Sequence, residues 1–265
     1  RICPATFYYV EHGRMLKIAR LCAEYLLENI MSGCCTIPPR EAPAIPLWIN
    51  GRPMLAMPLR FHEIREAATQ RLIRRVPMVD AELAASALNV AQQATGLPLA
   101  EVSHFLGELS QALEELEGHF AGLSAVESHT HLEAGKADVA HAIEFVQQLA
   151  QAPFNADAVD HDASVLALAG AGLPLSAALK LVLPMLLQGR AVTLVPDADA
   201  PSCALALAEL CGQCGLPDGL FNVVYVDDTV ALSLILDHGV QQVRLFGPSA
   251  WAQRWQTAAM NWPDR

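Results

Sequence analysis

Residues 164–195, SVLALAGAGLPLSAALKLVLPMLLQGRAVTLV, open a stretch that ends at Trp255 and alternates short apolar runs with helix-length segments. Such alternation predicts βαβ units with right-handed crossovers. The apolar runs are continuous, which is typical of parallel strands buried on both faces. The sequence therefore predicts an α/β fold, with a Rossmann-like parallel sheet and helices on both faces. The expected strands are Ser164–Ala169, Ala191–Val195, Phe221–Val226 and Gln242–Phe246, and the expected helices are Pro174–Gln188, Pro201–Cys214, Thr229–Asp237 and one from Ser249.

A helical layer is expected ahead of the sheet, over residues 60–150. Asp80 is suited to cap one of its helices, because a short carboxylate can accept from the first free N–H groups. Leu47–Arg52 (LWINGR) is expected to be a strand with an Asn-Gly turn. The expected helices are Phe61–Arg75, Asp80–Ala94, Pro98–Leu116 and Val139–Ala150.

Two regions are expected along the chain. Residues 1–46 combine a helical segment, Gly13–Met31, with a proline-rich linker. Residues 47–265 form one domain, in which the helical layer precedes a sheet over residues 164–258.

The composition excludes several classes of protein. Hydrophobic residues make up 53% and charged residues 17% of the chain, which indicates a globular fold. A formal charge of −11 argues against nucleic acid as a partner. Apolar runs are too short to span a membrane. The seven scattered cysteines indicate reduced thiols and a cytoplasmic location.

Three clusters leave alternatives open. The arginines at 65, 71, 74 and 75 favour a solvated face over a phosphate or CoA contact. Cys211 and Cys214 form a lone C-x-x-C, for which packing is favoured over metal or redox chemistry. No metal site is predicted. Surface positions are expected for four histidines: His119, His129, His131 and His141.

Four blocks, in this order, resemble the coenzyme-binding domain of the aldehyde dehydrogenase superfamily. They are GAGLPL (170–175), VPDA (195–198), GLPDGLFNVV (215–224) and LFGPS (245–249). The third closely matches the family's G-L-P-x-G-x-x-N-V-V, and Glu127–Thr130 lies where the family often has E-T-G-K. The resemblance covers roughly residues 47–255.

The resemblance implies an oxidoreductase that binds NAD or NADP and oxidises an aldehyde. In the family a cysteine attacks the carbonyl, and hydride then passes to the nicotinamide. Asp197 or Asp199 would bond a ribose hydroxyl and favour NAD. The implied coenzyme contacts are Ala169, Gly170, Ala171, Gly172, Pro196, Gly247 and Ser249. The glycines among them either let a nucleotide approach the backbone or permit tight strand–helix packing.

Several positions depart from the family pattern. Gly172 stands where the family has its oxyanion-binding Asn, Val195 replaces a Lys, and Pro248 removes an N–H donor. In family members the catalytic cysteine and the general base lie beyond the position of Arg265. No catalytic residue is therefore assigned, and we expect this chain alone to be inactive, as a fragment or an incomplete member.

Three functions remain open. The first is NAD(P)-dependent aldehyde oxidation, with acyl-CoA reduction as a variant, completed by the rest of a longer polypeptide. The second is a non-catalytic structural or oligomerisation domain, as in some bifunctional proline-catabolic enzymes. The third is an unrelated small-molecule-binding α/β module. A homo-oligomer is expected, without nucleic acid or membrane partners.

Overall fold

The computed structural model describes residues 42–66, 69–152, 164–170, 172–237, 240 and 242–260. The chain divides into two compact units, Arg1–Glu41 and Ala42–Arg265. The helix expected at Gly13–Met31 lies outside the described residues.

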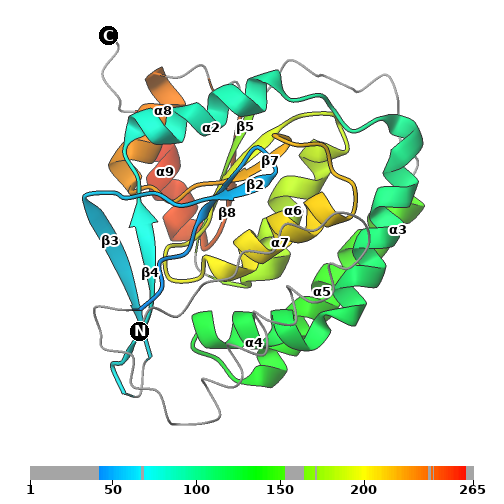
Figure 1. Cartoon of the computed structure of the whole chain (residues 1–265), viewed down its shortest axis with the longest axis horizontal. Coiled ribbons are helices and arrows are strands. Elements are labelled where there is room, and N and C mark those ends of the chain that lie inside the picture. The colour runs from blue at the N-terminus through cyan, green and yellow to red at the C-terminus, as the bar shows by residue number, and fades with distance from the viewer. Residues whose placement is uncertain are drawn as a thin grey trace, which may run out of the picture. The chain divides into compact units, whose positions relative to one another are not determined.

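A six-stranded mixed sheet forms the centre of this unit, in the order β2-β1-β7-β6-β5-β8 (Figure 1). The four strands β5 to β8 run parallel, which confirms the prediction for this part of the chain. Two antiparallel strands that the sequence did not place in this sheet extend it beside β7. The strands are β1 (Leu47–Ile49), β2 (Arg52–Met54), β5 (Val165–Ala169), β6 (Val192–Val195), β7 (Phe221–Val223) and β8 (Gln242–Phe246).

Helices cover both faces of the parallel strands, as predicted. α6 (Pro174–Leu186) packs on β5 and β6, and α7 (Ser202–Gln213) packs on β7. The chain then reverses direction across the sheet, so a right-handed crossover takes α8 (Asp228–Asp237) to the opposite face. There α8 contacts α2 (Ala81–Gln93), and α9 (Ser249–Met260) follows β8.

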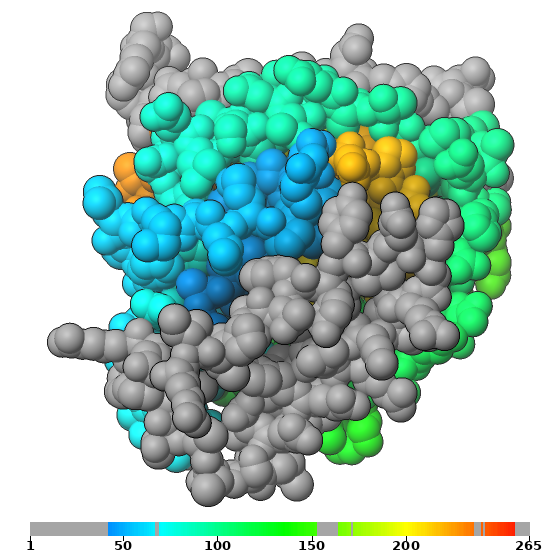
Figure 2. Space-filling model, in the orientation of Figure 1, coloured from blue at the N-terminus to red at the C-terminus, as the bar shows by residue number. Residues whose placement is uncertain are grey.

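The Asn-Gly turn between β1 and β2 packs beside α2. Asn50 and Gly51 have φ of 54° and 70°, the left-handed pair that a tight hairpin turn requires. A Cβ added to Gly219 would lie 3.1 Å from Val90 of α2 and 3.3 Å from Asn50. Figure 2 shows the blue hairpin and the teal helix side by side on the viewed face.

A second helical layer lies outside α6 and α7. It consists of α3 (Leu99–Glu115), α4 (Glu117–Glu127) and α5 (Leu132–Gln151). α3 matches its predicted segment, whereas α5 begins at Leu132, seven residues before the expected start at Val139. As predicted, Asp80 caps α2, the helix before this layer, through a 2.9 Å bond from Leu83 N to its Oδ1.

The helix expected at Phe61–Arg75 is wrong. This segment belongs to an antiparallel pair, β3 (Arg60–Arg65) and β4 (Leu72–Met78), which forms a separate two-stranded sheet. From Leu72 to Val76 the residues of β4 alternate, with Leu72, Arg74 and Val76 buried and Ile73 and Arg75 half-buried between them. That period of two is the mark of a strand, and the many charged residues concealed it.

The basic cluster of the sequence lies on this hairpin and is largely partnered. Arg65 bonds Glu63, Arg71 lies 3.8 Å from Glu66, and Arg75 donates to the carbonyl of Ala42. Arg74 points inward and pairs with Glu127 at 3.1 Å. The arginines therefore do not present a free phosphate-binding surface.

Buried carboxylates begin both helices on one face of the sheet. Asp138 of α5 accepts from the N–H groups of Leu175 and Ser176, each at 3.0 Å, at the start of α6. Glu127 of α4 accepts from Ser202 N at 2.9 and 3.0 Å, at the start of α7. Both carboxylates are buried, and each faces the positive end of a helix dipole. These bonds tie the outer helical layer to the sheet.

Close packing of α4 against α5 depends on Gly135. A Cβ at this position would lie 2.2 Å from the carbonyl oxygen of Ala121, which is backbone and cannot swing away. We predict that Gly135→Ala destabilises the unit by about 1–3 kcal/mol. The control Gly107→Ala, in exposed α3 surface with no atom near its Cβ, should stabilise by about 0.5–1 kcal/mol. Urea unfolding measures both, and equal effects of the two variants would contradict the contact.

The carboxyl of Glu127 makes stability depend on pH. Burial raises its pKa from 4.5 to about 6, although Arg74 and the bonds from Ser202 act in the opposite direction. The folded state therefore holds this proton more tightly than the unfolded state does. Stabilisation of about 2 kcal/mol is present below pH 4.5 and is lost as pH rises through about 6.

We predict that Glu127→Gln removes this loss. The amide oxygen can still accept from Ser202 N, but it does not titrate. The unfolding free energies of wild type and variant should be measured from pH 4 to 7.5. As pH rises over this range, the difference between them should change by about 2 kcal/mol in favour of the variant. Parallel curves would contradict the raised pKa, whatever the constant cost of leaving Arg74 without its carboxylate.

Candidate functional site

The strand order reverses between β5 and β8. The chain runs from β5 through β6 to β7 on one side and then returns to place β8 on the other side of β5. In open α/β sheets, ligands bind outside the carboxyl ends of strands where the order reverses in this way. Gly170 follows β5 and Gly247 follows β8, and Gly170 N donates to the carbonyl of Phe246 at 2.8 Å. Two residues that the family resemblance implied as coenzyme contacts therefore lie together here.

The indole of Trp251 covers both glycines. A Cβ at Gly170 would lie 2.9 Å from the Trp251 ring, and a Cβ at Gly247 would lie 2.8 Å from it. The Gly247 Cβ would also lie 3.2 Å from the Gly170 Cα, so the two backbones are close together. Of the two explanations left open for these glycines, tight strand–helix packing is the one that this arrangement displays.

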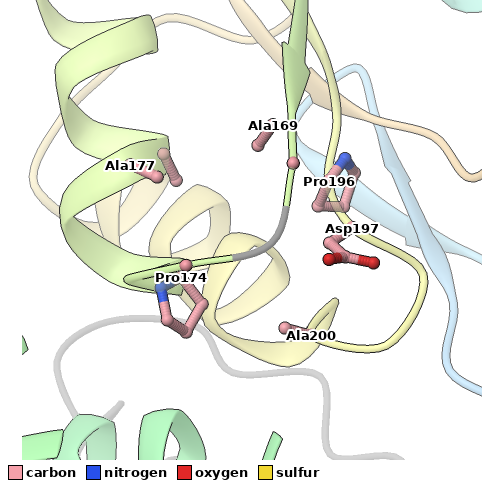
Figure 3. Close-up of a pocket in the computed structure, with 9 residues that line it drawn as sticks. Ala169, Pro174, Ala177, Pro196, Asp197 and Ala200 are labelled. Atoms are coloured by element: carbon pink, nitrogen blue, oxygen red, sulfur yellow. The ribbon is translucent and has the colours of Figure 1, made fainter. Parts of the chain in front are cut away.

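A small hollow lies beside these glycines, between the ends of β5 and β6. Figure 3 shows Ala177 of α6 opposite Ala169 and Pro196, with the Asp197 carboxylate nearby. The space open to water is about 10 Å³, enough for roughly one water molecule, whereas ligand pockets measure about 300–1,000 Å³. The lining residues are Ala169, Gly170, Gly172, Pro174, Ala177, Ala178, Pro196, Asp197 and Ala200.

The predicted contacts are thus partly assembled. Ala169, Gly170, Gly172 and Pro196 share the hollow. Gly247 lies against Gly170, and Ser249 is exposed at the start of α9 without lining the hollow. Ala171 lies outside the described residues. Gly172 has φ of 153°, a conformation that side chains disfavour, so an Asn at this position would be strained.

Three of the helix N-termini at this edge of the sheet are already occupied by carboxylates. Asp138 and Glu127 hold those of α6 and α7, and Asp227 accepts from Val230 N at 2.9 Å at the start of α8. A helix N-terminus favours an anion because its N–H groups are free. Among the described helices that follow the parallel strands, α9 is the one whose first turn shows no bond to a carboxylate. Pro248, which precedes it, has no N–H to donate.

Two side chains of β3 pair with carboxylates that follow β6 and β7. Arg60 pairs with Asp227 and His62 bonds Asp199, each at 2.7 Å. Burial raises the pKa of Asp197, whose carboxylate lines the hollow. Arg60 and His62 were not predicted because their segment was expected to be helical, and no sequence pattern marked Trp251 as part of this turn.

The described cysteines are poorly suited to nucleophilic attack. Cys203 and Cys211 are fully buried, and burial raises the pKa of both thiols. Burial also raises the pKa of Cys214 to about 11. Each thiol therefore stays protonated near neutral pH, and the thiolate is the reactive form.

Among the residues that the structure describes, no three His, Cys, Asp or Glu side chains come together as a metal site would require. Within the same residues, no helix has the length and apolarity needed to cross a membrane.

Comparison with known proteins gives one consistent family. The sequence profile of the Aldehyde dehydrogenase family matches residues 59–262. Lactaldehyde dehydrogenase of Escherichia coli K12 is 24% identical over 237 residues, which is 82% of this chain and 50% of that enzyme. A betaine aldehyde dehydrogenase of Cereibacter sphaeroides is 41% identical over 76 residues, 29% of this chain and 16% of its own length.

Solved structures show the same fold. NADP-dependent glyceraldehyde-3-phosphate dehydrogenase from Bacillus halodurans C-125, complexed with NADP, superposes with a TM-score of 0.70 at 16% identity. The match covers 82% of this chain and 51% of that structure. The chain thus spans about half the length of this enzyme and of the lactaldehyde dehydrogenase. Because the family profile matches most of its residues, the chain belongs to the aldehyde dehydrogenase family.

Proposed function

We propose that this chain is the coenzyme-binding portion of an NAD(P)-dependent aldehyde dehydrogenase family oxidoreductase. The observation that carries the proposal is the parallel order β7-β6-β5-β8, whose reversal brings Gly170 and Gly247 together at the carboxyl edge. The dinucleotide would lie across this reversal, with its phosphates toward the start of α9. The glyceraldehyde-3-phosphate dehydrogenase described above, which shares this fold, is complexed with NADP, and this supports the proposal.

The residues of this chain would bind and orient the dinucleotide. Backbone at Ala169–Gly172, at Pro196 and at Gly247–Ser249 would supply the contacts, with Asp197 beside the hollow as a candidate partner for a ribose hydroxyl. The coenzyme, when bound, accepts hydride from the aldehyde carbon. Because the described cysteines are kept protonated, we propose that the attacking thiolate is not one of them.

A second candidate is a non-catalytic family domain that serves packing or oligomerisation. It is favoured by the size of the hollow, about 10 Å³, and by the indole that covers both glycines. A dinucleotide that used the backbone of both glycines would require Trp251 to move. Saturable binding of NADH to the full chain, followed by nicotinamide fluorescence, would exclude this candidate. No binding at millimolar NADH or NADPH would exclude the first.

Gly247 gives a sharper test of the site. We predict that Gly247→Val abolishes NADH binding, because the added atoms would fill the gap to the Gly170 Cα, which even a Cβ would approach within 3.2 Å. The control Gly107→Val adds the same side chain to exposed α3 surface and should bind NADH as the wild type does. Unfolding curves check that both variants are folded. Undiminished binding by a folded Gly247→Val protein would remove this position from the site.

A further inference from the structure

We propose that Trp251 is a shutter over the coenzyme crevice, whose indole must leave Gly170 and Gly247 before a dinucleotide can bind. The inference rests on the proposed function, and it names the residue that sets the affinity of that site. Trp251 lies in the first turn of α9, and its ring lies against Gly170 after β5 and Gly247 after β8.

The contact geometry shows what the ring replaces. Built Cβ atoms at Gly170 and Gly247 would lie 2.9 and 2.8 Å from ring carbons, so the indole rests on the bare backbone of both residues. A phosphate that uses the same backbone must occupy the same space. Glycine lets another group approach the backbone closely, and in this structure that group is the Trp251 ring.

The Trp251 ring packs against one aromatic neighbour and is partly exposed to solvent. One edge meets Trp255 in a T-shaped arrangement with centroids 6.0 Å apart, and Trp255 is buried. Trp251 itself is only half-buried, and its neighbours Ala250 and Gln253 are exposed. A rotamer change of Trp251 therefore faces solvent rather than core, and such changes are rapid.

The shutter lowers the observed affinity by the fraction of molecules that are open. When the binding-competent form is a minor state, the apparent dissociation constant rises by the inverse of its population. Removing the ring makes every molecule competent. An increase in affinity on truncation is the opposite of what loss of a stacking contact would produce.

NADH titration of the full chain tests the shutter. Trp251→Ala should bind NADH at least tenfold more tightly than wild type, and Trp251→Phe, which keeps an aromatic ring over the glycines, should stay near wild type. Nicotinamide fluorescence is excited outside the tryptophan band, so the lost indole does not affect the signal. Unfolding midpoints confirm that both variants fold, and Trp251→Leu replaces Trp251→Ala if the latter does not.

A double-variant cycle tests the contact without any nucleotide. Gly170→Ala alone should lower the unfolding midpoint, because its Cβ meets the ring at 2.9 Å. In the Trp251→Ala background the same substitution should cost much less. Equal cost in both backgrounds would show that the indole does not rest on Gly170, and this would overturn the shutter.

The outcomes separate the two proposals. If wild type and Trp251→Ala bind NADH equally, the shutter is wrong and the coenzyme site stands. If Trp251→Ala binds more weakly, the ring is a stacking surface, and the shutter is again wrong. If neither protein binds NADH or NADPH at millimolar concentration, the proposed function fails and the shutter fails with it. Tighter binding by Trp251→Ala alone supports both.

Discussion

Two buried carboxylates connect the outer helices of this protein to its sheet. Asp138 and Glu127 accept hydrogen bonds from backbone N–H groups at the starts of α6 and α7. Without these carboxylates, the N–H groups would be buried without partners. Removing such an acceptor leaves the donors unsatisfied, which is more costly than the bond itself is favourable. The position of α6, and hence of the turn from β5 that begins the crevice, depends on these bonds.

The same bonds shape the chemistry of the carboxyl edge. Helix starts that follow parallel strands are natural anion sites, but in α6, α7 and α8 a carboxylate of the chain already accepts from them. What is left is the junction of β5, β8 and α9, where Gly170 and Gly247 expose backbone. The ring of Trp251 covers that junction, which is where we propose that the coenzyme binds.

Local patterns in the sequence were enough to predict the parallel strands and their helices, and the family resemblance implied one site for Gly170 and Gly247. Continuous apolar runs and glycine-bounded helices are properties of neighbouring residues. The β3–β4 hairpin was misjudged because Arg65, Arg71, Arg74 and Arg75 hid an alternation of two. Asp138, Glu127 and Trp251 could not be assigned roles, because each acts on residues far along the chain, and only the folded structure brings them together.

Fluorine NMR of the chain labelled with 5-fluorotryptophan tests the closed crevice most directly. The four tryptophans give separate reporters, and Trp48 on β1 serves as a distant reference. The account predicts that NADH shifts the Trp251 resonance, assigned by its loss in a Trp251→Phe sample, while the Trp48 resonance stays in place. Saturable NADH binding that leaves the Trp251 resonance unmoved would contradict it.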